Sequence, residues 1–156
     1  MKDIIEALKR QRLNIATAES CTGGLLASSI TDISGASEVF ELGFVSYSNR
    51  IKEEILGVPA ETIEKFGVYS LETAAEMAKC ARQNSGADIG IGITGVAGSE
   101  PQEGIPAGKV FIALASETDL LFAETEPQSK NRKTIKEAAT KAAIKLLKQY
   151  LNEKEN

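Results

Sequence analysis

The sequence predicts an α/β layered domain with a mixed sheet. Apolar runs typical of buried strands alternate along the chain with segments whose apolar residues recur at helical spacing. Near the C-terminus, two strand-like runs are separated by only four residues, 116–119, which predicts a hairpin and therefore an antiparallel pair in the sheet. The length of 156 residues fits one domain, and we expect a single domain over residues 1–156.

In the first half of the chain, periodicity predicts a short amphipathic helix, a strand, a second helix, a strand and a third helix. Ser48 is a suitable N-cap for the third helix, and Gly57 a suitable end. The predicted ranges are 2–12, 13–18, 25–33, 39–47 and 49–56.

In the second half, Ser70 is a suitable N-cap for a long helix that ends near Gly86. The strand that follows alternates isoleucine with glycine, so another backbone or a helix is expected to approach it closely. We expect the charged tail, 152–156, to be frayed. The predicted ranges are a helical turn at 59–66, the strand at 88–93, a loop at 94–108, strands at 109–115 and 120–125, and a helix at 129–151 whose inner stripe is Ile135, Ala139, Ala142, Leu146 and Tyr150.

Composition excludes several classes of function. The chain has no histidine, which excludes Ser-His-Asp and Cys-His catalysis and the usual zinc sites. A net charge of −4 argues against a nucleic-acid partner. Cys21 and Cys80 have no metal-ligand spacing and are expected to be free thiols in a reducing cytosol. The chain shows neither a signal-peptide pattern nor a membrane-spanning run, so we expect a cytoplasmic protein without membrane contact.

A short polar turn, residues 19–24, lies between a predicted strand and a predicted helix. Such a turn points backbone N–H groups and the positive end of the helix at one place, which favours an anion or the oxyanion of acyl transfer. Ser20 or Cys21 could then be a nucleophile, and Thr22 could donate to a phosphate. The spacing fits equally well a structural turn, in which hydroxyls cap the helix and two glycines allow a tight bend.

A second group is Tyr-Ser-Asn-Arg-Ile-Lys at 47–52. Lys52 falls in the first turn of its predicted helix, where the positive helix end favours the neutral amine and lowers a lysine pKa. A lysine of this kind can act as general base where histidine is missing, and Tyr47 could relay the proton or hold the lysine. From position alone, a solvated Lys52 paired with Glu53 or Glu54 is the commoner outcome.

Two further groups lie later in the chain. The glycine-rich turn 94–98 follows a buried strand directly, and ligands of open α/β sheets bind beyond the carboxyl ends of strands. This turn and the turn 19–24 could therefore converge on one ligand. Taken alone, the glycines of the turn 94–98 would indicate only an ordinary loop. The lysine-rich helix at 129–151 is mostly a solvated face, but Arg132 in its first turn can reach a phosphate.

Together these segments resemble the C-terminal domain of the CinA family, which includes nicotinamide-nucleotide deamidases (PncC). The resemblance covers about residues 5–150 and depends on the combination of short motifs in the family's order. The motifs are TAESCTGGL at 17–25, SGAS at 34–37, YSN at 47–49 with Lys52, LGV at 56–58, Ser70 with Met77 and Ala78, and TGVAG at 94–98.

The resemblance implies a three-layer α/β/α fold and hydrolysis of the carboxamide of nicotinamide mononucleotide to nicotinate mononucleotide and ammonia, in pyridine-nucleotide recycling, without metal or cofactor. It implies that Ser20 is the nucleophile and that Tyr47 and Lys52 complete the catalytic set. A homo-oligomer is also expected. The expected substrate-binding residues are Glu19, Cys21, Thr22, Gly23, Gly24, Asn49, Thr94, Gly95, Gly98 and Arg132.

The chain departs from the family pattern at two places. Many members continue the TGxAG motif with Pro-Gly-Gly, whereas residues 99–104 here are SEPQEG. Of two spaced arginines that often precede the last helix, Arg132 matches the second, and the earlier position is polar and uncharged. Both changes lie where phosphate or ribose would be held. The main alternative is therefore a catalytically silent nucleotide-binding module; a DNA-handling accessory, suggested by the family's name, fits the acidic balance poorly.

Overall fold

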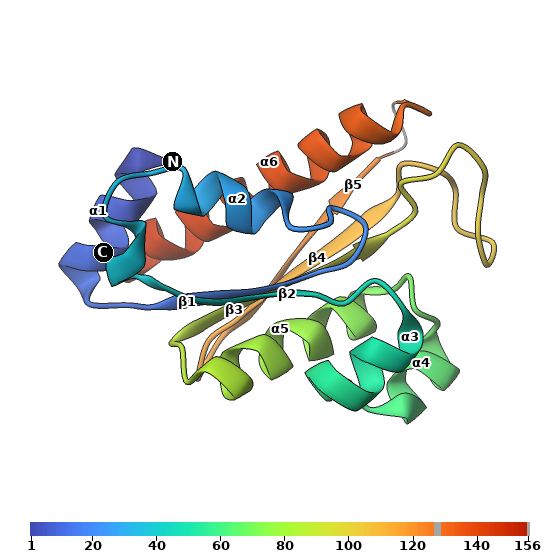
Figure 1. The fold of residues 1–156 in the computed structure, drawn as a ribbon, viewed down its shortest axis with the longest axis horizontal. Helices are drawn as coiled ribbons and strands as arrows, with labels where there is room; N and C mark the ends of the chain where they lie inside the picture. The colour runs from blue at the N-terminus through green and yellow to red at the C-terminus, as the bar shows by residue number, and fades with distance from the viewer. Residues whose placement is uncertain (127–128, 156) are drawn as a thin grey trace.

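A five-stranded mixed sheet runs through the centre of the protein (Figure 1). The computed structural model describes residues 1–126 and 129–155. The strands lie in the order β2-β1-β3-β4-β5; β1 is parallel to β2 and β3, and the other two pairs are antiparallel. The predicted hairpin and the mixed sheet are therefore confirmed. The strands are β1 Ile15–Glu19, β2 Phe40–Val45, β3 Ile89–Gly95, β4 Val110–Ala115 and β5 Leu120–Thr125.

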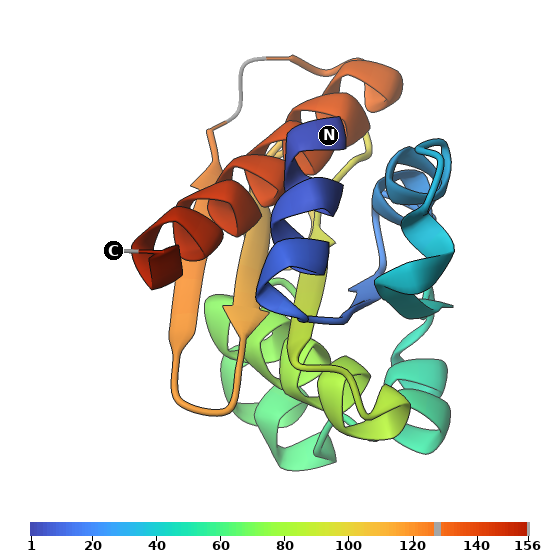
Figure 2. The same ribbon diagram turned by 90° about the vertical axis from the view of Figure 1, so that its left-hand side faces the viewer.

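Helices cover both faces of the sheet, which confirms the three-layer α/β/α architecture (Figures 1 and 2). On one face lie α1 Lys2–Gln11, α2 Leu25–Thr31 and α6 Arg132–Glu155, with the 3₁₀ turn η1 Ala36–Glu38. On the other lie α3 Asn49–Ile51, the π-helical turn η2 Lys52–Leu56, α4 Ala60–Phe66 and α5 Leu71–Ser85. Figure 2 shows α1 beside α6, so the N-terminal segment packs against the last helix.

Two glycines of β3 explain why α5 lies so close to this central strand. An ideal Cβ on Gly90 would lie 1.9 Å from the carbonyl O of Ala78, and one on Gly92 would lie 2.1 Å from the carbonyl O of Ala74. No side chain fits between these backbones, so only glycine is compatible with this contact. The close approach predicted from the Ile-Gly alternation is confirmed.

Two serines begin helices as predicted. Oγ of Ser70 accepts a hydrogen bond from the N–H of Thr73 at 3.1 Å, and Oγ of Ser48 accepts one from the N–H of Ile51 at 3.3 Å. Gly57, at φ 94°, ends the helical segment that begins at Asn49. That segment is not one regular helix, because it changes to π-helical geometry at Lys52.

Several boundaries differ from the predictions, and two of these differences come from long-range contacts. The tail is not frayed up to residue 155: α6 continues through Glu155, which forms an ion pair with Arg10 of α1. Gly95 belongs to β3 rather than to the loop, because it pairs with Val110 of β4. In α6, Ala143 is fully buried and Ala142 only half-buried, so the inner stripe is rotated slightly from the predicted one.

No helix within residues 1–126 and 129–155 is both long enough and apolar enough to cross a membrane.

Candidate active site

Ser20 follows the last residue of β1, at the carboxyl edge of the two parallel strand pairs. Its N–H donates to the carbonyl O of Ile93 in β3 at 2.9 Å, so the backbone is held against the neighbouring strand. Ala16 and Ala18 of β1 pack with Met77 of α5. Because side chains alternate along a strand, Ser20 points toward this same face, where α3, η2 and α5 lie.

Lys52 reaches Ser20 from that face. Its side chain is 1 % exposed, and its Nζ lies 3.1 Å from Oγ of Ser20 and donates to the carbonyl O of Ser46 at 2.9 Å. The π-helical turn begins at this residue, and the N–H groups of Gly57 and Val58 both donate to its carbonyl O. Turns of this kind are frequent at functional sites, and here the turn holds the lysine under the end of β1.

Burial lowers the pKa of Lys52 below its ordinary value, because the charged ammonium is poorly solvated there. The solvated alternative is therefore wrong, and Glu54 forms its ion pair with Arg50 at 2.6 Å instead. The direction of the predicted pKa shift is confirmed, and its main cause is burial. A neutral amine carries one lone pair, which can accept the Ser20 hydroxyl proton at the observed distance.

Cys21, the other nucleophile left open by the sequence, is buried beside Ser20. Burial raises its pKa to about 12, so the side chain is a thiol and not a thiolate near neutral pH. The geometry therefore favours Ser20, whose Oγ is in contact with the Lys52 amine, over Cys21. The second cysteine, Cys80, is a free buried thiol on α5, as predicted.

Glu19 occupies the N-terminal end of α2. Its buried carboxylate accepts hydrogen bonds from Oγ1 of Thr22 at 2.6 Å and from three N–H groups, those of Ala27 at 2.8 Å, Leu26 at 3.1 Å and Gly24 at 3.2 Å. The positive end of this helix thus holds a carboxylate of the protein itself. The prediction of an anion site at the helix end is wrong for that reason, and the Glu19 and Thr22 side chains face each other.

One part of the turn remains suited to an oxyanion. The N–H of Gly23 is already used by the carbonyl O of Ser20 at 3.0 Å. The N–H groups of Cys21 and Thr22 instead approach the Cys21 sulfur, which packs in the core cluster with Leu26 and Ile135. These two N–H groups lie directly after the candidate nucleophile, which is the position that acyl transfer requires of an oxyanion donor. The positive φ values of Gly23 and Gly24, 62° and 92°, allow the chain to bend there.

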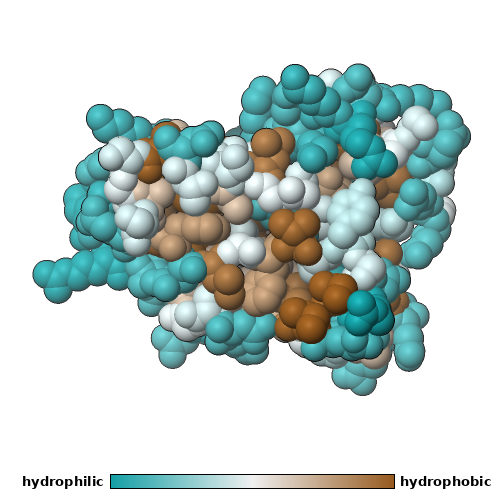
Figure 3. Space-filling model, in the orientation of Figure 1, coloured by the Kyte–Doolittle hydropathy of each residue, from teal (hydrophilic) through white to brown (hydrophobic). Residues whose placement is uncertain are grey.

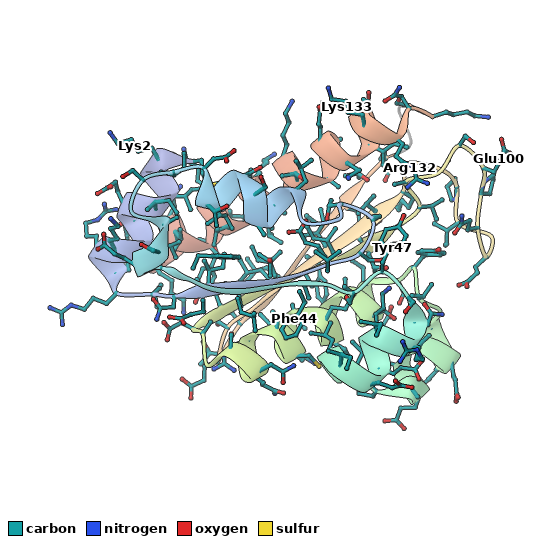
Figure 4. The ribbon with its side chains drawn as sticks, viewed as in Figure 1. Lys2, Phe44, Tyr47, Glu100, Arg132 and Lys133 are labelled. Carbon is teal, nitrogen blue, oxygen red and sulfur yellow. The ribbon has the colours of Figure 1, made fainter. Side chains whose placement is uncertain are left out.

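Tyr47 is 62 % exposed and pairs with Arg132 rather than with Lys52 among the residues described. Nη1 of Arg132 donates to the Tyr47 hydroxyl at 3.2 Å, and Figure 4 shows the two side chains facing each other from the end of β2 and the start of α6. The structure thus brings together two pairs, Ser20 with Lys52 and Tyr47 with Arg132. Asn49, exposed at the start of α3, lies between Tyr47 and Lys52 in the sequence.

Lys136 lies on the lysine-rich helix whose cations the sequence predicts to form a mostly solvated face. An ideal Cβ on Gly23 would lie 3.4 Å from its Nζ, so the amine lies against the 19–24 turn. Lys136 is one helical turn after Arg132, and this i,i+4 spacing was the signal that could have found it. Two cations of α6 therefore reach the carboxyl ends of β1 and β2.

The turn 94–98 is partly structural. Oγ1 of Thr94 is buried and donates to the carbonyl O of Val68 at 2.8 Å, and an ideal Cβ on Gly95 would lie 2.5 Å from Cα of Val110. Both residues therefore serve packing, whereas the space around Gly98 is more open. Because β1 and β3 are parallel neighbours, this turn and the turn 19–24 do lie at the same sheet edge, as predicted.

The altered loop after this turn is tied to the start of α5. The hydroxyl of Tyr69 donates to Oε1 of Gln102, and Gln102 also pairs with Ile105 through two backbone hydrogen bonds. Tyr69 is half-buried. Its pKa is raised mainly by burial and, to a smaller extent, by the negative charge of Glu103. Electrostatic interactions with Cys21 and Tyr47 also contribute to the raised pKa of Tyr69, so its hydroxyl lies within electrostatic range of these two residues.

The model of the CinA C-terminal domain family matches residues 1–151. The chain belongs to this family. A relative from Desulforamulus reducens, named as a competence-damage inducible protein, is 45 % identical over 142 residues, which is 91 % of this chain and 34 % of the relative. A second, from a Thermoanaerobacter species, is 42 % identical over 151 residues, 95 % of this chain and 36 % of the relative. The chain thus spans about a third of the length of these relatives.

Solved structures of CinA proteins have the same fold. A competence/damage inducible protein from Agrobacterium tumefaciens superposes with a TM-score of 0.90 at 37 % identity, over 96 % of this chain and 92 % of that chain. A CinA superfamily protein from Klebsiella pneumoniae superposes with a TM-score of 0.92 at 29 % identity, over 97 % of this chain and 95 % of that chain. The resemblance in sequence motifs is therefore confirmed at the level of family and fold.

Proposed function

We propose that this CinA domain is an amidohydrolase that converts nicotinamide mononucleotide to nicotinate mononucleotide and ammonia. The observation that carries the proposal is the buried pair of Ser20 and Lys52, whose Oγ and Nζ lie 3.1 Å apart. A serine with a desolvated lysine is a nucleophile with its general base, and it needs no histidine. The choice of nicotinamide mononucleotide as substrate rests on the resemblance to nicotinamide-nucleotide deamidases.

In the proposed reaction, Oγ of Ser20 attacks the carboxamide carbon while its proton passes to neutral Lys52. The C–O bond forms, and negative charge develops on the carboxamide oxygen. The N–H groups of Cys21 and Thr22 stabilise this charge. The C–N bond then breaks as the leaving nitrogen takes up a proton and departs as ammonia. Water attacks the acyl-enzyme in the same way, with Lys52 again as base, and releases the acid.

The nucleotide part of the substrate would lie over the start of α6. Arg132 and Lys136 supply positive charge for the 5′-phosphate at the carboxyl ends of β1 and β2. Guanidinium groups bind phosphate through paired N–H donors, so the contact with Tyr47 serves to orient the Arg132 fork. Tyr69, held by Gln102, offers a flat apolar ring for the pyridine.

We also propose that the protein self-associates through the face around the edge strand β2. Several large apolar side chains are exposed there: Leu42 at 36 %, Val45 at 54 % and Ile55 at 60 %. Figure 3 shows apolar side chains gathered on this face, over β2 and the α3–η2 segment. An edge strand with exposed apolar side chains is prone to pair with another chain. Sedimentation velocity of the wild type and of Val45→Lys tests this, and a monomeric wild type would contradict it.

Release of ammonia from nicotinamide mononucleotide is the direct test of the function. Wild type should release ammonia and nicotinate mononucleotide in equal amounts, and Ser20→Ala, which removes only the nucleophilic oxygen, should release neither. Binding of the mononucleotide without turnover would contradict the amidohydrolase and favour the nucleotide-binding module. Retention of DNA that weakens with salt would favour a nucleic-acid function instead.

A further inference from the structure

Two buried hydroxyls have no hydrogen-bond partner among the residues that the structure describes. They are Oγ1 of Thr17 in β1 and Oγ of Ser46, directly after β2. Ser46 is 1 % exposed and Thr17 is fully buried. Buried polar groups are nearly always paired, so an unpaired hydroxyl requires an explanation. The two hydroxyls lie on opposite faces of the sheet, so each unpaired hydroxyl needs its own explanation.

The register of β1 and β2 places Ser46 beside Ser20. Ala18 is paired with Phe44 and Glu19 with Val45, and the N–H of Ser46 donates to the carbonyl O of Glu19 at 2.9 Å, which extends the ladder by one residue. Residues opposite each other in a sheet project to the same face. Phe44 packs with Ala18 in the cluster on the α5 face, so two residues further on Ser46 and Ser20 share that face too.

Thr17 projects to the other face. It is paired with Gly43, and an ideal Cβ on Gly43 would lie 3.3 Å from Oγ1 of Thr17 and 3.2 Å from Cβ of Ala27 in α2. Its hydroxyl is therefore among α2 side chains, on the side of the sheet away from Lys52. The side chain of Thr17 therefore lies on the opposite face of the sheet from Lys52, and Thr17 provides a matched control.

Ser46 already holds the base by its backbone. Its carbonyl O accepts from Nζ of Lys52 at 2.9 Å, while the same Nζ lies 3.1 Å from Oγ of Ser20. Once Lys52 has taken the Ser20 proton it carries three N–H groups. The unpaired Oγ belongs to the same residue as the carbonyl O that holds this ammonium, and rotation about the Cα–Cβ bond is the only motion that its hydroxyl needs to change direction. No bulk water reaches the buried hydroxyl to compete.

We propose that the Ser46 hydroxyl relays the proton from Lys52 to the departing ammonia, an inference that rests on the proposed amidohydrolase function. Lys52 gives one proton to Oγ of Ser46 as the hydroxyl proton of Ser46 moves to the leaving nitrogen. The C–N bond breaks with its electron pair on that nitrogen, and ammonia leaves. Ser46 ends as a neutral hydroxyl and Lys52 as a neutral amine, so no charge or proton is left over.

The test compares Ser46→Ala with the control Thr17→Val. Ser46→Ala removes the hydroxyl but keeps the carbonyl that holds Lys52, and each variant removes one unpaired buried oxygen. Ser46→Ala should lower kcat for ammonia release by about 100-fold, the lower range of general acid–base catalysis, with KM changed by less than about threefold. Thr17→Val should leave kcat within about twofold of wild type. Ser46→Thr, which keeps a hydroxyl, should recover at least about a tenth of the wild-type rate.

An activated ester separates a relay from a structural effect. The p-nitrophenolate of p-nitrophenyl acetate leaves without a proton, so the acylation burst of Ser46→Ala should stay within about threefold of wild type. Equal losses on ester and amide, or an amide kcat unchanged by Ser46→Ala, would overturn the relay and leave the amidohydrolase standing. A wild type that releases no ammonia would overturn the function, and the relay with it, since there would be no leaving amine to protonate.

Discussion

Nη1 of Arg132 donates a 3.2 Å hydrogen bond to the hydroxyl of Tyr47, and this bond joins the start of α6 to the end of β2. Both side chains are exposed, so the bond adds little to the stability of the fold. Its effect is to fix the direction of a planar guanidinium beside the carboxyl ends of β1 and β2. That direction is the basis of the first prediction.

Arg132→Ala should weaken the preference for nicotinamide mononucleotide over the unphosphorylated riboside by about ten- to a hundredfold, the value of one charge-assisted hydrogen bond. Tyr47→Phe, which removes only the bond to Arg132, should act in the same direction and less strongly. The measurement is kcat/KM for nucleotide and riboside in each variant. Lys133→Ala, one residue along α6, is the control for lost charge. An unchanged preference in Arg132→Ala would remove this residue from the phosphate site.

Cys21 should be dispensable, because its thiol stays protonated with a pKa of about 12. Cys21→Ala should keep most of the wild-type rate, and iodoacetamide at pH 7 should not inactivate the wild type within minutes. Mass spectrometry of the alkylated sites shows whether the reagent reached the sulfur. Inactivation of wild type together with resistance of Cys21→Ala would reverse the assignment of the nucleophile.

Lys52→Arg should lower the rate by about two to four orders of magnitude, since guanidinium keeps the charge but does not give up its proton. In wild type, kcat/KM should rise with pH as Lys52 becomes neutral. The midpoint should lie below 10.5, because burial lowers the pKa of this lysine. A rate for Lys52→Arg within a few-fold of wild type would show that Lys52 is not the base.

Burial of Lys52 also predicts how stability depends on pH. Between the lowered pKa of Lys52 and 10.5, the unfolded chain binds the proton that the folded protein has lost. In that window the free energy of unfolding of wild type, relative to Lys52→Met, should rise with pH, by at most about 1.4 kcal/mol per pH unit. Urea denaturation of both proteins from pH 7 to 10.5 measures the difference. A difference that falls with rising pH would contradict a pKa lowered by burial.

Glu19→Ala should destabilise the fold rather than only the reaction. The change leaves the N–H groups at the start of α2 without their buried carboxylate, at a cost of about 3 kcal/mol from two or more charge-assisted bonds. For a chain of this size the melting temperature should fall by about 6–12 °C. Glu38→Ala, which breaks only the exposed pair with Lys9, should barely change it. Equal melting temperatures for both variants would show that Glu19 does not hold α2.

Local chemistry was sufficient to predict much of this protein. Hydroxyl caps at Ser48 and Ser70, the four-residue hairpin turn and the Ile-Gly strand each depend on neighbours in the chain, and each was confirmed. The motif around Ser20, with Tyr47 and Lys52, led to the correct family. The absence of histidine limited the choice of base to a few residue types.

Long-range contacts decided the rest, because burial and partnership depend on residues that are distant in sequence. A lysine with two glutamates beside it looks solvated, and only the packing of η2 under β1 buries Lys52 and brings its Nζ within 3.1 Å of Oγ of Ser20. Glu19 looks like a ligand of the substrate until the start of α2 folds onto its carboxylate. The Tyr47 hydroxyl accepts a hydrogen bond from Arg132, 85 residues away in the sequence, instead of pairing with the nearby Lys52. Ser46 carried no signal in the sequence, since its importance comes from the strand register that sets it opposite Ser20.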